Sequence, residues 1–408
     1  MANKFDFIPK KVLNKPVSFN FQVPEEDIVE FKKLLELSKI GPATWWNQHG
    51  DAEFGVSRQW LIDAKEAWLT TFDWRKHEEY INKFPNFKTL IQDHEIGESE
   101  IHFAALFSAK EDAIPIIFMH GYPSSFTDFL PMMELLVEKY TPDTLPYHII
   151  VPSLPDYGLS STRNQKVEMT LERSARIMNQ LMVDLGFGEG YVAQGGDLGS
   201  LLARIMSIRF KECKAFHLNM LLLNGGQAVP SLDTLGPEDL HLLKRTESWR
   251  KTGLAYALEH GTRPATVGLV ISSSPLALLA WVGEKLMEWT DPRQLFPLDT
   301  ILSMVSFYWF TNTFPRSLYH ATLVKEYFLG NDLPHPTSLE KPLGYSVFPY
   351  DLTILPEPWA RKTYPNLAFF NRHIKGGHFA SIEQPEALLE DVETFIGGMS
   401  GSFASRYT

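Results

Sequence analysis

An acidic residue stands on a tight, glycine-rich turn near the middle of the chain. The segment 194–200 reads Gln-Gly-Gly-Asp-Leu-Gly-Ser, and it places Asp197 between a short apolar run at 191–193 and an apolar helical pattern from Leu201. A carboxylate can displace a leaving group from saturated carbon, because water can afterwards hydrolyse the resulting ester. A serine would form a stable ether instead. Asp197 is therefore predicted to be a nucleophile that forms a covalent intermediate, with a helix N-cap as the structural alternative.

A strand, a glycine-flanked turn and a helix together make the nucleophile elbow of α/β-hydrolases. The turn requires small residues because its backbone is strained and closely packed. Serine usually occupies the exposed position, in the motif G-x-S-x-G, but the chain contains no such motif. The segment 195–199 places aspartate there, which disfavours a serine esterase.

Two further residues follow in the chain order that this fold uses, nucleophile, acid and histidine. His378 lies on the loop Gly-Gly-His-Phe at 376–379, and Asp351 ends the run that begins at 345. We expect His378 to deprotonate the hydrolytic water and Asp351 to fix the tautomer and orientation of its ring. Glu357 is the second choice for the acid because it lies further past the strand.

The loop His-Gly-Tyr-Pro at 120–123 directly follows an apolar run at 114–119. In an α/β-hydrolase this loop supplies one N–H group of the oxyanion hole, and the residue after the nucleophile supplies the other. We therefore expect the N–H groups of Tyr122 and Leu198 to bind the ester carbonyl oxygen. Each such donor stabilises the transition state by roughly 3–4 kcal/mol.

The leaving group is expected to be either a halide or the oxygen of an epoxide. A halide needs N–H donors beside the nucleophile, and Leu198 supplies no side-chain donor. An epoxide oxygen needs a proton donor, and a tyrosine hydroxyl stays protonated at neutral pH. Tyr256, Tyr308, Tyr319 and Tyr327 are candidates, and the residues alone do not choose among them.

Apolar runs that alternate with helical patterns predict a mostly parallel α/β sheet. The predicted strands are 114–119, 148–151, 191–193, 215–220, 345–348 and 367–370. A helical block separates the fourth from the fifth, and an insertion there would cover the ligand-binding edge of the sheet. We expect an N-terminal helical extension over 1–105, a first part of the core over 106–220, a helical lid over 221–344 and a second part of the core over 345–408.

Composition narrows the class of protein. The 408 residues carry a net charge of −11, and no basic run predicts a nucleic-acid partner. The single cysteine, Cys213, allows no internal disulfide, and the first residues lack the apolar core of a signal peptide. The most apolar stretch, 265–286, is expected to be a buried helix pair, and the histidines show no metal-binding motif. A cytoplasmic protein without membrane anchor, metal or cofactor is expected.

Taken together, five motifs resemble those of the microsomal-type epoxide hydrolases, and the soluble fungal members most of all. The motifs are His-Gly-Tyr-Pro at 120–123, Gln-Gly-Gly-Asp-Leu-Gly at 194–199, Tyr-Ala-Leu-Glu-His-Gly-Thr-Arg-Pro at 256–264, Phe-Pro-Tyr-Asp at 348–351 and Gly-Gly-His-Phe at 376–379. The resemblance covers nearly the whole chain. It implies an α/β-hydrolase core with a helical lid that converts small hydrophobic epoxides, aromatic ones among them, and water into vicinal diols, as in detoxification.

The resemblance also implies residue roles. Tyr256 and Tyr319 match the pair of tyrosines that opens the ring in this family, and by position the nucleophile, base and acid are those named above. The chain departs from the family at Tyr122, where tryptophan is usual, at Leu198, where isoleucine is commoner, and at Asp156, where glycine is usual.

Three pocket residues are expected from these loops, namely His120, Pro123 and Asp156. We expect the departures to affect the shape of the accepted substrate and the preferred enantiomer.

Three other functions stay open from the sequence. A haloalkane dehalogenase would use the same nucleophile, and a biosynthetic enzyme would open one epoxide within a natural product. A noncatalytic binding protein would bind its ligand equally well without Asp197. A homodimer is one of the assemblies that the sequence leaves open.

Overall fold

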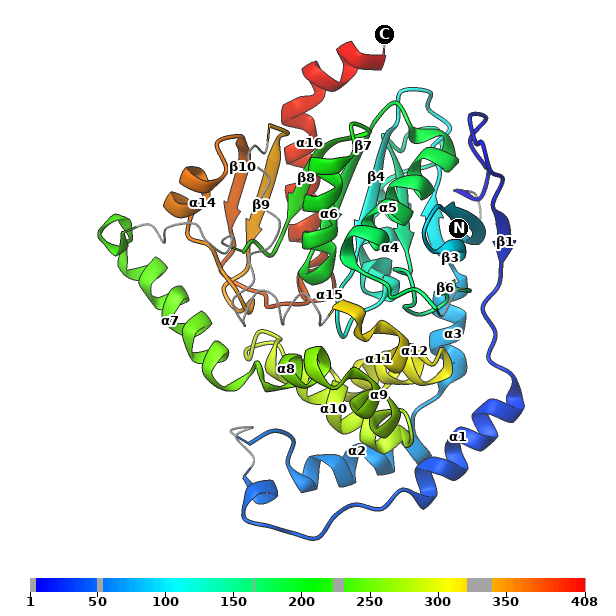
Figure 1. The fold of residues 1–408 in the computed structure, drawn as a ribbon, viewed down its shortest axis with the longest axis vertical. Coiled ribbons are helices and arrows are strands. Elements are labelled where there is room, and N and C mark those ends of the chain that lie inside the picture. Colours follow the sequence, from blue (N-terminus) through cyan, green and yellow to red (C-terminus); the bar gives the residue numbers. More distant parts are fainter. Residues whose placement is uncertain (1–4, 50–53, 164–165, 223–230, 321–339, 408) are drawn as a thin grey trace.

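The structure is a computed structural model that describes residues 5–49, 54–163, 166–222, 231–320 and 340–407. Within these residues, one ten-stranded sheet has the strand order β1-β2-β3-β5-β4-β7-β8-β9-β10, and β6 pairs with β3 (Figure 1). The pairs from β5 across to β10 are parallel, and those formed by β1, β2, β3 and β6 are antiparallel. The strands are β1 (Val17–Phe19), β2 (Asn86–Asp93), β3 (Gly97–Leu106), β4 (Ile114–Met119), β5 (Tyr147–Pro152), β6 (Ser161–Thr162), β7 (Tyr191–Gly195), β8 (Cys213–Leu218), β9 (Leu343–Val347) and β10 (Leu367–Arg372).

The predicted α/β class is confirmed, because continuous apolar runs form the central parallel strands. Every residue of β5, β7 and β9 is buried, as expected for strands with helices on both faces. All six predicted strands are present, with ends shifted by a few residues. The lid and the second part of the core therefore meet at the start of β9, Leu343.

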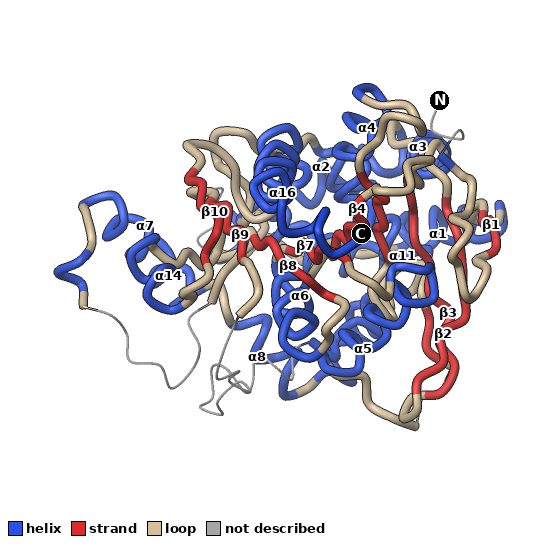
Figure 2. The backbone as a smooth tube through the Cα atoms, turned by 90° about the horizontal axis from the view of Figure 1, so that it is seen from above, coloured by secondary structure: helices blue, strands red, loops and turns tan. Residues whose placement is uncertain are grey.

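Helices cover both faces of this sheet. Figure 2 shows α5 and α6 on one side of the strands and α4 and α16 on the other. The helices of the core are η3 (Phe126–Phe129), α4 (Leu130–Lys139), α5 (Leu171–Met182), η4 (Val183–Phe187), α6 (Asp197–Arg209), α14 (Glu357–Thr363), α15 (Ala380–Glu383) and α16 (Pro385–Tyr407).

The predicted helical insertion lies between β8 and β9 and covers the ends of the parallel strands (Figure 1). Its described helices are η5 (Leu232–Thr234), α7 (Pro237–Thr252), α8 (Ala255–Thr262), α9 (Pro264–Ile271), α10 (Pro275–Glu288), α11 (Leu298–Phe310), α12 (Thr313–Arg316) and η6 (Ser317–His320). The apolar stretch at 265–286 forms α9 and α10, which are bent by 115° where they meet. No single helix among the described residues is long and apolar enough to cross a membrane, and these two pass the test only as a bent pair.

The expected helical extension over 1–105 is wrong from residue 86 onward. Residues 86–106 form a β2–β3 hairpin that pairs with β5 and extends the central sheet, and β1 lies beyond it. The sequence carries this signal, because Phe87, Thr89 and Ile91 alternate with polar or exposed residues on one strand, as Ile101 and Phe103 do on the next. The region therefore belongs partly to the core sheet.

The remaining N-terminal helices pack against the outside of the lid. They are α1 (Glu25–Leu37), η2 (Trp46–Gln48), α2 (Arg58–Thr70) and α3 (Trp74–Asn82). The indole N–H of Trp68 donates to Ser306 Oγ of α11 at 3.0 Å, and the ring of Phe31 lies 5.3 Å from that of Phe310. Burial of these aromatic side chains fixes the lid from the side that faces away from the sheet.

Candidate active site

The turn between β7 and α6 brings the carboxylate of Asp197 to the end of the sheet. Asp197 has a φ of 48°, in the left-handed region that is uncommon for a residue with a side chain. A Cβ atom on Gly195 would lie 2.1 Å from the carbonyl carbon of Gly199, and one on Gly199 would lie 1.9 Å from the oxygen of Met119. These contacts explain the glycines on either side of the turn.

The carboxylate of Asp197 is bound by backbone N–H groups rather than serving as a helix cap. The N-cap of α6 is Gly196. Asp197 Oδ1 accepts a hydrogen bond from the Tyr122 N–H at 2.8 Å, and the Leu198 N–H also binds the carboxylate. Both expected donors of the oxyanion hole therefore lie at the same side chain. The N-cap alternative is wrong.

His378 lies between two carboxylates. Its Nδ1 is 2.7 Å from Asp351 Oδ1, and its Nε2 is 3.4 Å from Asp197 Oδ2. The carboxylate of Asp351 also accepts the Leu352 N–H at 2.7 Å, which fixes its position. When the ring is neutral, this arrangement favours the tautomer with the proton on Nδ1, and Nε2 faces Asp197.

The alternative acid, Glu357, is occupied elsewhere. Its Oε1 lies 2.7 Å from the guanidinium of Arg361, four residues later in α14. Of the two candidate acids, the structure brings only Asp351 to His378.

The charges of these groups shift their pKa values. Burial raises the pKa of Asp197, but the hydrogen bond and charge of His378 and the two N–H groups lower it more, so the net pKa is lowered. Burial lowers the pKa of His378, whereas the carboxylates of Asp351 and Asp197 raise it more, so the net pKa is raised. The resting site therefore favours a carboxylate beside an imidazolium.

Two lid tyrosines pack against the loops that surround Asp197. The ring of Tyr256, in α8, stacks on that of Tyr122 at 5.8 Å with an interplanar angle of 18°. The ring of Tyr319, in η6, meets the edge of Tyr157 at 6.0 Å. Burial and the charge of Asp197 both raise the pKa of Tyr256, which keeps its hydroxyl protonated.

Tyr308, another tyrosine candidate, is hydrogen-bonded to a different loop. The hydroxyl of Tyr308 donates to the carbonyl of Ser124 at 2.8 Å and so supports the loop after β4. Tyr327 lies outside the described residues.

Known proteins are similar to this chain over most of its length. The family model of the epoxide hydrolase N terminus matches residues 16–129, and that of the alpha/beta hydrolase fold matches residues 114–261. Epoxide hydrolase 1 of Sus scrofa is 30% identical over 93% of this chain and 88% of its own length. A relative in Dothistroma septosporum, whose name assigns it provisionally to the epoxide hydrolases, is 43% identical over 95% of this chain and 91% of its own. The solved epoxide hydrolase of Aspergillus niger is 43% identical, with a TM-score of 0.90 over 96% of this chain and 99% of that one.

The chain belongs to the epoxide hydrolase family. Formation of an ester on an aspartate is general for this family. The predicted resemblance, fold and class of enzyme are therefore confirmed.

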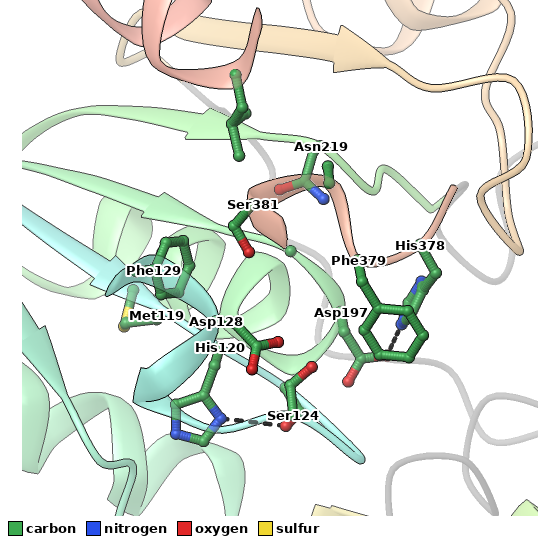
Figure 3. Close-up of a pocket in the computed structure, with 14 residues that line it drawn as sticks. Met119, His120, Ser124, Asp128, Phe129, Asp197, Asn219, His378, Phe379 and Ser381 are labelled. Atoms are coloured by element: carbon green, nitrogen blue, oxygen red, sulfur yellow. Dashed lines mark hydrogen bonds and ion pairs between the residues drawn. The ribbon is translucent and has the colours of Figure 1, made fainter. Parts of the chain in front are cut away.

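A cavity of about 30 Å³ lies beside Asp197 in this epoxide hydrolase, and both Asp197 and His378 line it. Figure 3 shows Asp128 and Ser124 on the wall of the same space. Polar side chains and room for one or two water molecules suit the cavity to hold water.

The three expected pocket residues have different surroundings. His120 lines the cavity, and its Nε2 accepts the Leu154 N–H at 3.1 Å while burial lowers its pKa to about 4. Pro123 follows a cis peptide bond in the loop whose Tyr122 N–H donates to Asp197. Asp156 accepts the N–H and hydroxyl of Thr162, each at 2.9 Å, and so fixes its own loop.

The sequence did not identify the residues that hold the His378 loop. Glu383 Oε2 accepts the N–H groups of Asp291 at 2.7 Å and Gly377 at 2.9 Å, and its Oε1 accepts that of Phe379 at 3.0 Å. The His378 N–H donates to the Trp289 carbonyl at 2.9 Å. The end of α10 in the lid is therefore bound directly to the loop of the histidine. Among the described residues, no group of three or more His, Cys, Asp or Glu side chains could hold a metal ion.

Proposed function

We propose that this epoxide hydrolase converts small hydrophobic epoxides to vicinal diols through an alkyl ester on Asp197. The observation that carries the proposal is the environment of one carboxylate. Its Oδ1 is bound by the Tyr122 N–H, and its Oδ2 faces His378. Because Oδ1 is already held as a carbonyl oxygen would be, Oδ2 is the atom that attacks the epoxide.

In the first half-reaction, Oδ2 of Asp197 forms a bond to one epoxide carbon while the bond from that carbon to the ring oxygen breaks. The ring oxygen gains negative charge and takes a proton from a tyrosine. The partly buried Tyr256 and the buried Tyr319, both protonated, are the donors we propose. Each donor acts most strongly when the charge develops, which is the condition for accelerating the step.

Ester formation removes the negative charge of Asp197 and so prepares the second half-reaction. The pKa of His378 falls when this charge disappears, since an adjacent anion favours the protonated ring. Its proton returns to the tyrosine that opened the ring. Neutral His378 can then accept a proton from water, and Asp351 stabilises the imidazolium that forms.

Water attacks Cγ of the ester, and the carbonyl oxygen becomes an oxyanion held by the N–H groups of Tyr122 and Leu198. When the tetrahedral intermediate collapses, the bond from Cγ to the former Oδ2 breaks and the oxygen from water stays on Cγ. The leaving alkoxide takes the second proton of that oxygen. The diol departs with the former Oδ2, and Asp197 is again a carboxylate beside a protonated His378. The cavity that Asp197 and His378 share is lined by residues of the core and supports access of water to the ester.

The test is diol formation from styrene oxide by the purified wild type and by Asp197→Ala. The proposal expects diol from the wild type only. Diol from both proteins contradicts the covalent mechanism. Failure of both across a panel of epoxides, with halide release from haloalkanes by the wild type, favours the dehalogenase alternative. Failure across both panels, with ligand binding retained in Asp197→Ala, supports the noncatalytic alternative.

The location and assembly are also proposals. We propose a cytoplasmic enzyme, supported by the single cysteine, Cys213, which is buried. Light scattering on the purified chain tests whether it forms the homodimer that the sequence left open.

A further inference from the structure

One buried cation lies beside the proposed ring-opening tyrosine. Lys285 belongs to α10, and only 4% of its side chain is exposed. Its Nζ is 5.1 Å from the centroid of the Tyr256 ring and 5.0 Å from that of the Trp281 ring. Lysine is almost never fully buried without a partner, because desolvation of its charge is costly.

The partner carboxylate is more exposed than the cation. Lys285 donates to Glu284, whose side chain is 32% exposed. Glu288 lies on the same helix, where burial and the charge of Glu284 raise its pKa and the charge of Lys285 opposes them. The buried end of the ion pair is therefore directed at the aromatic rings, while Glu284 reaches solvent.

The rings around Lys285 form a rigid support for Tyr256. The indole N–H of Trp281 donates to His260 Nε2 at 3.0 Å. The edge of His260 meets Tyr256 at 5.3 Å and Tyr122 at 5.2 Å. His260 thus helps to hold Tyr256, and Trp281, which binds His260, also lies beside the cation.

We infer that Lys285 accelerates ester formation by stabilising the negative charge that Tyr256 gains as it gives its proton to the epoxide oxygen. This inference rests on the proposed role of Tyr256. A cation over the face of a ring is attracted by the ring electrons, and the attraction increases as the hydroxyl becomes a phenolate. The gain is larger in the transition state than in the ground state, so it raises the rate. Lys285 acts through Tyr256 and touches no substrate, and it is therefore a positioning residue.

The experiment compares single-turnover rates of ester formation and ester hydrolysis. Lys285→Met removes the charge but keeps an unbranched apolar side chain. Ester formation is expected to slow about tenfold, in the range of a desolvated cation–π interaction, while hydrolysis changes less than about twofold. Lys285→Arg, which keeps the charge, should recover most of the rate.

The decisive control is the double variant with Tyr256→Phe. If Lys285 acts through the hydroxyl, K285M causes no further slowing of ester formation in a protein that already carries Y256F. Independent, multiplicative effects, or equal slowing of both steps by K285M alone, would overturn the inference. Absence of any effect of Tyr256→Phe would instead refute the proposed role of Tyr256, which separates the two failures.

A second variant tests the inference if Lys285→Met does not fold. Glu284→Gln breaks the ion pair but leaves the cation over the ring, so ester formation should be at least as fast as in the wild type. A slower ester formation in E284Q would show that the ion pair matters as a structural unit and would overturn the inference.

Discussion

Replacement of the proposed nucleophile, Asp197, should change the protonation of the proposed base, His378, in a measurable way. In Asp197→Asn the side chain keeps its volume but loses its charge, as it does in the alkyl ester. The distance from His378 Nε2 to Asp197 Oδ2 is 3.4 Å. At an effective dielectric constant of about 20, two unit charges at this distance attract by about 5 kcal/mol, or between about three and four pKa units.

Part of this energy is offset, because an amide oxygen can still accept a hydrogen bond from His378. We therefore expect the pKa of His378 to fall by at least about 1 unit, the lower end of the range for an adjacent opposite charge. The sign follows from the structure, since the carboxylates are what raise the pKa of this buried ring.

The assay is a pH titration of the histidine ring signals by NMR. The chain has 13 histidines, so the signal is assigned by its loss in Asp197→Asn combined with His378→Gln. His148 is the internal control, because burial alone lowers its pKa to about 4 and no carboxylate is involved. A change of less than about half a unit at His378, or an upward change, would refute the account of how ester formation creates the base.

Three further predictions test the other parts of the site. Tyr256→Phe and Tyr319→Phe should each slow ester formation by about 10- to 100-fold, since a hydrogen bond to a developing charge is lost. The rate of ester hydrolysis should change much less. Equal slowing of both steps in single-turnover kinetics would contradict the role of these tyrosines as proton donors. Gly121→Ala places a Cβ atom 2.1 Å from Oδ1 of Asp197. The rate of ester formation should therefore fall by at least about 100-fold, while the melting temperature changes little. An active variant would show that the carboxylate is free to move. Asp351→Asn should slow ester hydrolysis by about 10²–10⁴-fold, because it removes the charge that orients and stabilises the imidazolium, and mass spectrometry should detect the accumulated ester. Glu357→Gln is the matched control and should react within about twofold of the wild type. Equal loss of activity in both variants would refute the choice of Asp351 as the acid.

The parts of this enzyme that could be predicted are those encoded by short contiguous signals. Central strands buried on both faces read as apolar runs, and the turn at Asp197 carries its own glycines. His378 and Asp351 could be assigned because they follow predicted strands in the order that the fold requires. Each of these inferences depends on neighbours in sequence, and the structure brings the three side chains together.

The parts that were missed depend on contacts between distant segments. The helical patterns before residue 86 predict helix for the whole of 1–105, whereas the β2–β3 hairpin forms through pairing with β5. Glu383 binds the backbone of Asp291, 92 positions away in sequence, and no local pattern announces such a pairing. The role inferred for Lys285 likewise requires that α10 lie against α8 in the lid.

The central claim is that the oxygen added to the epoxide carbon comes from Asp197 and not directly from water. A single turnover in water labelled with heavy oxygen, with enzyme in excess over styrene oxide, tests it most directly. The account predicts an unlabelled first diol and label in the peptide that contains Asp197, because water attacks Cγ of the ester. Label in the first diol, with none in that peptide, would contradict it.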